Sequence, residues 1–164
     1  MTDGTLKRPM RVYADTSVFG GARDREFRDL SEPFFARVRA GAVRLLVSSV
    51  VVDELEGAPE DVRAFFEELA PLIERVEIAD DAYAPREADL RAGVVGPKWD
   101  VDALHVAVAT VSGCRAIVSW NFRHIVNFKR IPLYNGVNLA HGFAAIAIHT
   151  PQEVVFDDDE DEDV

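Results

Sequence analysis

The sequence has little cysteine and no long apolar run, and both shortages narrow the class of protein. Cys114 is the only cysteine among 164 residues, so the chain can form no intrachain disulfide and offers no Cys/His cluster for structural zinc. The longest apolar stretch, residues 45–52, is interrupted by two serines and is far shorter than the ~20 residues of a membrane helix. The N-terminal "MTDGTLKRP" lacks the apolar core of a secretory signal. We therefore expect a cytoplasmic protein without a membrane span.

Basic residues are also in the minority, with 18 Lys and Arg against 29 Asp and Glu and a net charge of −11. The run "DDDEDED" at residues 157–163 supplies seven of these acids, and the rest of the chain carries 22 acids against 18 bases. Adjacent like charges repel, so we expect residues 151–164 to form a disordered, solubilising acidic tail. Alternatively, the tail mimics a polyanion and competes for a basic surface. The mildly acidic body argues against non-specific coating of nucleic acid, but it does not exclude an enzyme that gathers its negative charge around a metal.

Apolar segments with strand character alternate with amphipathic segments along the chain. We predict strands over residues 11–17, 43–47, 73–78, 116–119 and 143–148. We predict helices over residues 31–41, with Ser31 as N-cap, 50–55, from 59 onward, 81–93 and 99–113. The last of these is apolar nearly all round and should be buried, whereas residues 126–139 are ambiguous. This alternation predicts one α/β domain at residues 11–150, after a leader of residues 1–10, with a parallel sheet covered on both faces.

Polar side chains follow several of the predicted strands. Asp15 ends the apolar run in "RVYADTSVFG", Glu54 comes soon after the second strand, and Asn121 follows "AIVSW". Ligands of parallel sheets bind beyond the carboxyl ends of the strands, so these residues are candidates for one site. The alternative for Asp15 is a turn in which its carboxylate bonds to nearby backbone N–H groups.

The segment "WDVDALHVAVAT" holds two more acids. Asp100 is a natural N-cap, and a carboxylate in the first turn of a helix is stabilising by about 0.3–1 kcal/mol. Asp102, however, lies in an otherwise apolar segment, and an isolated buried carboxylate costs several kcal/mol. A hard divalent cation would compensate Asp15, Glu54 and Asp102 together, because Mg²⁺ and Mn²⁺ prefer oxygen ligands. Such an ion also lowers the pKa of a bound water, which suits hydrolysis of a phosphodiester.

The histidines give weaker signals. His105 lies three residues after Asp102 and could belong to a mixed His/Asp site, but we interpret it as a satisfied core residue. His141 and His149 show no spacing that indicates zinc or a general base.

The stretch "WNFRHIVNFKR" combines the basic residues Arg123, His124, Lys129 and Arg130, of which Arg123 and Lys129 are the stronger candidates, with Trp120, Phe122 and Phe128. Cations contact phosphates and aromatic rings stack on bases, so this mixture suits RNA binding. The alternative is a solvated loop whose aromatic residues close the end of the sheet. Further candidates for the rim of the pocket are Lys98 and Arg23.

Four short motifs occur in a defined order: "VYADTSV", "SSVVVDEL", "DVDALHVAVA" and "IVSWNFRHI". In this order they resemble the PIN-domain family, metal-dependent ribonucleases that include the VapC-like toxins of toxin–antitoxin pairs. The resemblance extends over residues 11–149. It implies a three-layer α/β/α sandwich with a central parallel sheet and an acidic pocket at its carboxyl edge.

The resemblance also assigns roles to individual positions. Asp15, Glu54 and Asp102 match the first three acids of the family. Ser17 matches the small polar residue that often supports the first acid or a metal-bound water. Asn121 stands where the family frequently has Asp, and its amide can ligate a metal or hold water but adds no charge for a second metal ion.

The function implied is a Mg²⁺- or Mn²⁺-dependent endoribonuclease that leaves 5′-phosphate and 3′-hydroxyl ends. The resemblance implies metal binding by the three acids, water orientation by Asn121, and substrate contact by Ser17, Arg123 and Lys129. The partners implied are an RNA substrate, an antitoxin protein and a second copy of the chain. The alternative, suggested by the uncharged Asn121, is a catalytically weak or inactive PIN-like module that binds RNA or a protein. A third interpretation, an aspartyl phosphohydrolase, fits less well because "DTSV" lacks the second acid of such enzymes.

Overall fold

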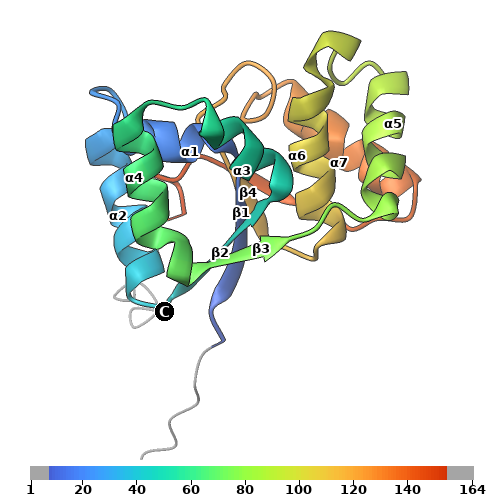
Figure 1. Ribbon diagram of the computed structural model, residues 1–164. Coiled ribbons are helices and arrows are strands. Elements are labelled where there is room, and N and C mark those ends of the chain that lie inside the picture. The colour runs from blue at the N-terminus through green and yellow to red at the C-terminus, as the bar shows by residue number, and fades with distance from the viewer. Residues whose placement is uncertain (1–7, 155–164) are drawn as a thin grey trace, which may run out of the picture.

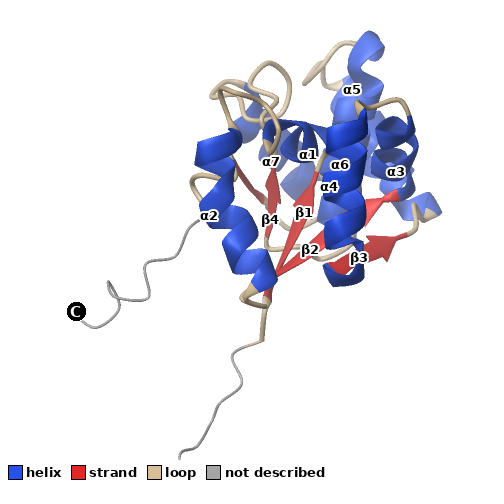
Figure 2. Cartoon of the chain, turned by 60° about the vertical axis from the view of Figure 1, so that its left-hand side comes forward, coloured by secondary structure: helices blue, strands red, loops and turns tan. Residues whose placement is uncertain are grey.

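Five parallel strands form the centre of the protein, whose computed structural model describes residues 8–154. The strands are β1 (Met10–Ala14), β2 (Val43–Ser48), β3 (Ile73–Val76), β4 (Ala116–Val118) and β5 (Ala147–His149). They are ordered β3-β2-β1-β4-β5 (Figure 2). Val12, Tyr13 and Ala14 of the central strand are fully buried, which explains why β1 reads as an unbroken apolar run. The carboxyl ends of all five strands lie at one edge of the sheet.

Helices cover both faces of this sheet (Figure 1). They are α1 (Thr16–Gly21), α2 (Arg28–Arg39), α3 (Ser49–Glu56), α4 (Glu60–Leu69), α5 (Tyr83–Arg91), α6 (Asp100–Val111) and α7 (Arg130–Ala140). α1 packs against α2, α3 and α4, whereas α5 packs against α6 and α7 on the other side. The predicted three-layer α/β/α sandwich with a central parallel sheet is confirmed.

The predicted burial of the apolar helix is also confirmed. α6 buries every residue from Ala103 to Ala109, and only its ends reach the surface. His105 lies within this buried stretch and is 3% exposed.

Several predicted boundaries were wrong. The first strand ends at Ala14, and the final strand is confined to Ala147–His149. The ambiguous segment forms α7, whose Pro132 stands in the first turn, where a missing N–H costs no helical hydrogen bond. Asp100 is not the N-cap of α6 but its first residue, and Trp99 takes the cap position.

Ser31 is not the N-cap of α2, because the helix begins earlier, at Arg28. Ser31 is 1% exposed, and its Oγ accepts a hydrogen bond of 3.1 Å from Trp120 Nε1. The same indole lies so close to Gly21 that a Cβ there would stand 2.4 Å from Trp120 Cδ1. The glycine is therefore needed for close packing between α1 and the chain after β4.

The folded part is slightly longer than the predicted domain. β1 begins at Met10, and Val154, assigned to the tail, is 5% exposed and packs in the core. The acidic run at 157–163 lies outside the described residues. Within residues 8–154, no helix has the length and apolarity that crossing a membrane requires.

Candidate active site at the carboxyl edge of the sheet

Asp15 follows β1 directly and is 4% exposed. Two hydroxyl groups hold its carboxylate: Ser17 Oγ donates to Oδ1 at 2.6 Å, and Ser119 Oγ donates to Oδ2 at 2.8 Å. These partners come from α1 and from the residue after β4, so neighbouring strands bring them together. The carboxylate thus does more than close a local turn.

Burial raises the pKa of Asp15, and the negative charge of Asp102 raises it further. His105 and the two serine hydroxyls act in the opposite direction. A positive charge at this point would offset both the burial and the repulsion.

Glu54 projects from α3 toward the same edge. Its Oε1 accepts a bond of 3.0 Å from Thr16 Oγ1, next to Asp15, and lies 2.9 Å from His105 Nε2. The hydrogen bond with His105 lowers the pKa of Glu54. Glu54 is therefore connected to the segment of Asp15 through Thr16 of α1, and to the helix of Asp102 through His105 of α6.

Both ring nitrogens of His105 have partners. An ionised Glu54 can only accept, so Nε2 of His105 carries a proton. Nδ1 lies 2.8 Å from the hydroxyl of Tyr13, which in turn lies 2.8 Å from Ser48 Oγ. Burial raises the pKa of Tyr13, so its hydroxyl stays protonated. This chain of bonds fixes the imidazole that holds Glu54.

Asp102 pairs with a second histidine. His124 Nδ1 lies 3.0 Å from Asp102 Oδ2, and His124 is 5% exposed. The imidazole stacks on Trp99 at 4.2 Å between ring centroids, and Tyr134 donates to its backbone carbonyl at 2.8 Å. Glu54 and Asp102 are thus each held by one buried histidine.

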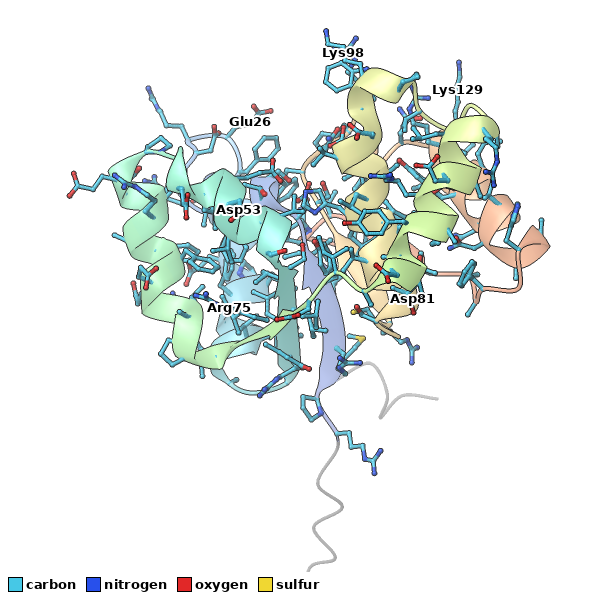
Figure 3. The ribbon with its side chains drawn as sticks, turned by 45° about the vertical axis from the view of Figure 1, so that its right-hand side comes forward. Glu26, Asp53, Arg75, Asp81, Lys98 and Lys129 are labelled. Atoms are coloured by element: carbon cyan, nitrogen blue, oxygen red, sulfur yellow. The ribbon has the colours of Figure 1, made fainter. Side chains whose placement is uncertain are left out.

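A cleft of about 280 Å³ opens beside these acids. Its lining comes from α3, α6 and the turn before α6: Val50, Asp53, Glu54, Lys98, Trp99, Val101 and Asp102. Lys98 Nζ and Arg123 Cζ lie 5.1 and 5.5 Å from the Trp99 ring centroid. In Figure 3, Lys98 and Lys129 lie at the end of the molecule toward which the strands run, beyond Asp53 on α3. Acids and cations therefore share this end.

The donor set suits a hard cation, although each acid is held by a neighbour. Within residues 8–154, no group of three or more His, Cys, Asp or Glu side chains is disposed to hold a metal ion. Both bonds to Glu54 fall on Oε1, and His124 contacts Oδ2 of Asp102. Glu54 and Asp102 each keep a second carboxylate oxygen outside these contacts, and carboxylate oxygens are the ligands that Mg²⁺ and Mn²⁺ prefer. The residues therefore fit such a cation by the chemistry of their donor atoms.

The other predicted site residues take varied positions. Asn121 Oδ1 accepts from the backbone N–H groups of Arg123 and His124 at 3.2 and 3.0 Å, so this amide closes a turn. Ser17, besides holding Asp15, accepts from the Trp120 N–H at 2.9 Å. Arg23 does not belong to the rim of the cleft, because its guanidinium lies 4.8 Å from the Phe65 ring centroid on α4.

Sequence reasoning did not find Ser119, it considered His124 only for phosphate contact, and it gave His105 only a core role. Ser119 follows β4 directly, so the rule that led to Asp15 could have found it. His105 lies one helical turn after Asp102, a spacing that places the two side chains near each other. No spacing in the sequence indicates that His124 meets Asp102.

The all-parallel five-stranded sheet between helical layers, with acids at its carboxyl edge, agrees with the PIN-like fold that the sequence motifs imply. A chain in the crystal structure of VapBC2 from Rickettsia felis, bound to a DNA fragment from their promoter, has this fold at a TM-score of 0.57. The two chains are 14% identical, and the match covers 86% of this chain and 98% of that chain. No family model matches the sequence, and neither does any curated protein. At this identity the likeness shows the fold alone.

Proposed function

We propose that the protein is a Mg²⁺- or Mn²⁺-dependent endoribonuclease of the VapC-like type. The observation that carries the proposal is the buried carboxylate of Asp15, which shares one sheet edge with the Glu54–His105 and Asp102–His124 pairs. Burial and a neighbouring acid both raise the pKa of Asp15, an arrangement that a divalent cation would stabilise. The PIN-like fold supports the same conclusion.

In this proposal Asp15, Glu54 and Asp102 hold the cation. A bound Mg²⁺ or Mn²⁺ polarises a phosphoryl oxygen and lowers the pKa of its water. The hydroxyls of Ser17 and Ser119 fix the carboxylate of Asp15, and the two histidines fix the other two acids. The cations of Lys98 and Arg123 stand beside the cleft, where they suit contact with a phosphate of the RNA backbone.

The proposal extends to a protein partner. The solved structure with the same fold is of VapBC2 bound to promoter DNA. We infer that this chain likewise pairs with an antitoxin-type protein, and a homodimer is part of the same proposal.

A second candidate is a PIN-like module that binds RNA or a protein without cutting. The observation that favours it is the use of Asn121 Oδ1 in a backbone turn, which leaves no acid at the fourth position of the family pattern. In the first proposal three acids suffice for one cation, and Asn121 orients water only if its side chain leaves the turn.

A cleavage assay distinguishes the two candidates. Structured and unstructured RNAs are incubated with the protein in Mn²⁺, in Mg²⁺ and in chelator. Asp15→Asn and Asp102→Asn should each lower cleavage by about 10²-fold or more, because loss of even a residue that supports a metal ligand commonly costs 10–100-fold. Glu56→Gln, an exposed acid on the same helix as Glu54, is the matched control and should retain activity. RNA binding without cleavage would instead favour the module.

A further inference from the structure

The charge of the chain is unevenly distributed. No Asp or Glu occurs between Asp102 and Glu153, although the protein as a whole is acidic. Three of the four Lys and Arg residues in this interval, Arg123, Lys129 and Arg130, lie in residues 119–130, which are the loop between β4 and α7 together with the first residue of α7. This loop is therefore a cationic segment beside an acidic cleft.

Side-chain bonds fix the backbone of the loop at both ends. Asn121 Oδ1 closes one turn, and Asn127 Oδ1 closes a second by accepting from the N–H groups of Lys129 and Arg130 at 3.1 and 3.3 Å. Asn127 Nδ2 donates to the carbonyl of Phe122 at 3.0 Å, and Arg130 Nε donates to the carbonyl of Arg123 at 3.0 Å. These bonds join the two turns and hold the loop in one conformation.

This fixed loop presents aromatic rings to solvent. Phe128 is 94% exposed and Phe122 is 49% exposed. Phe122 is supported from behind by Phe27 and Trp120, at 6.1 Å between ring centroids in both cases. Arg123 lies against Trp99 in the wall of the cleft, so this loop borders the candidate active site.

We propose that residues 119–130 form a single-stranded RNA-binding platform, on which an unpaired base stacks on Phe128 while Lys129 and Arg123 contact the backbone leading into the cleft. This inference rests on the proposed function, because it names unpaired RNA as the substrate of that site. Every base has a face for stacking, so an exposed ring with cations beside it binds single strands with little sequence preference. A platform that is already rigid loses little entropy when it binds.

Single-stranded RNA fits these features better than a duplex or a protein. The bases of a duplex are stacked on each other and offer no free face to Phe128. Protein interfaces bury their aromatic residues in a core depleted of charge, whereas here the exposed ring stands next to Lys129 and Arg130.

The test is fluorescence anisotropy with a labelled, unstructured RNA oligonucleotide in chelator, so that binding is measured without cleavage. Phe128→Ala should weaken binding of the single strand at least about fivefold, because stacking on an aromatic residue contributes 1–3 kcal/mol per base. The same variant should leave the affinity for a duplex of that sequence unchanged. Leu139→Ala, which removes another exposed apolar side chain on α7, is the matched control and should have no effect. Lys129→Ala should reduce the slope of log K against log salt by about 0.7.

Unchanged single-strand affinity in Phe128→Ala would overturn the platform, and so would an equal loss on single strand and duplex. Circular dichroism of the variant checks the fold, which the exposure of Phe128 should preserve. Failure of the proposed function has a different signature: the wild type then binds the single strand in chelator but does not cut it in Mn²⁺. Cleavage by the wild type with no effect of Phe128→Ala would overturn the platform alone.

Discussion

Asp89 on α5 is a buried carboxylate whose replacement by asparagine should stabilise the protein at neutral pH. The residue is 1% exposed, and its Oδ1 has no hydrogen-bond partner within residues 8–154. Burial raises the pKa of Asp89 from 3.8 to about 7. Asparagine has nearly the same shape and carries no charge, so it removes the cost of ionisation without opening a cavity.

The sign and size of the effect follow from proton binding. Between about pH 4 and pH 7 the folded protein keeps the proton of Asp89 and the unfolded chain releases it, so the free energy of unfolding falls as the pH rises. At 1.36 kcal/mol per pKa unit, the difference between about 7 and 3.8 corresponds to roughly 4 kcal/mol. The asparagine variant lacks this loss.

Urea unfolding monitored by circular dichroism measures the effect at about pH 5 and about pH 8. The stability gained by Asp89→Asn should be larger at the higher pH by roughly 3 kcal/mol, the part of the loss that falls in this interval. Asp81→Asn, an exposed substitution of the same type just before α5, is the control. A gain that is the same at both pH values would refute the reasoning, because Asp89 would then titrate alike in the folded and unfolded states.

Two further predictions concern the site and the packing behind it. His105→Leu should weaken Mn²⁺ binding in a calorimetric titration by about 10- to 100-fold, because Glu54 loses the imidazole that orients it. His105→Gln keeps an N–H donor and should retain more of the affinity. Equal loss of affinity in both variants would show that orientation is not the role of His105. In urea unfolding, Gly21→Ala should lower the free energy of unfolding by about 1–3 kcal/mol through its clash with Trp120. The control is Gly20→Ala, whose added Cβ meets nothing within 4 Å and which should be neutral or stabilising. An unchanged free energy of unfolding in Gly21→Ala would contradict the close packing.

The sequence was sufficient to predict the layers of the fold and the edge that carries the site. Fully buried strands and the apolar α6 stand out in the sequence as continuous apolar runs, and acids that follow parallel strands must meet at one edge. The segment that forms α7 was harder to assign because Pro132 and Gly136 interrupt its helical pattern. Local signals were misleading where tertiary contacts decided, as at Ser31, whose hydroxyl serves Trp120 rather than a helix end.

The contacts that shape the site could not be predicted from local sequence. His105 meets Glu54 across 51 positions, and Ser119 meets Asp15 across 104. Such pairs depend on strand order and helix packing, and one sequence shows neither. The direction of the Asn121 side chain depends equally on the fold of its loop.

The central claim is that three acids at the carboxyl edge of the sheet bind a divalent cation. A calorimetric titration with Mn²⁺ tests it directly on the wild type, Asp15→Asn and Glu56→Gln. The account predicts saturable uptake by the wild type and by Glu56→Gln, and its loss in Asp15→Asn. No uptake by the wild type, or equal uptake by all three proteins, would contradict it.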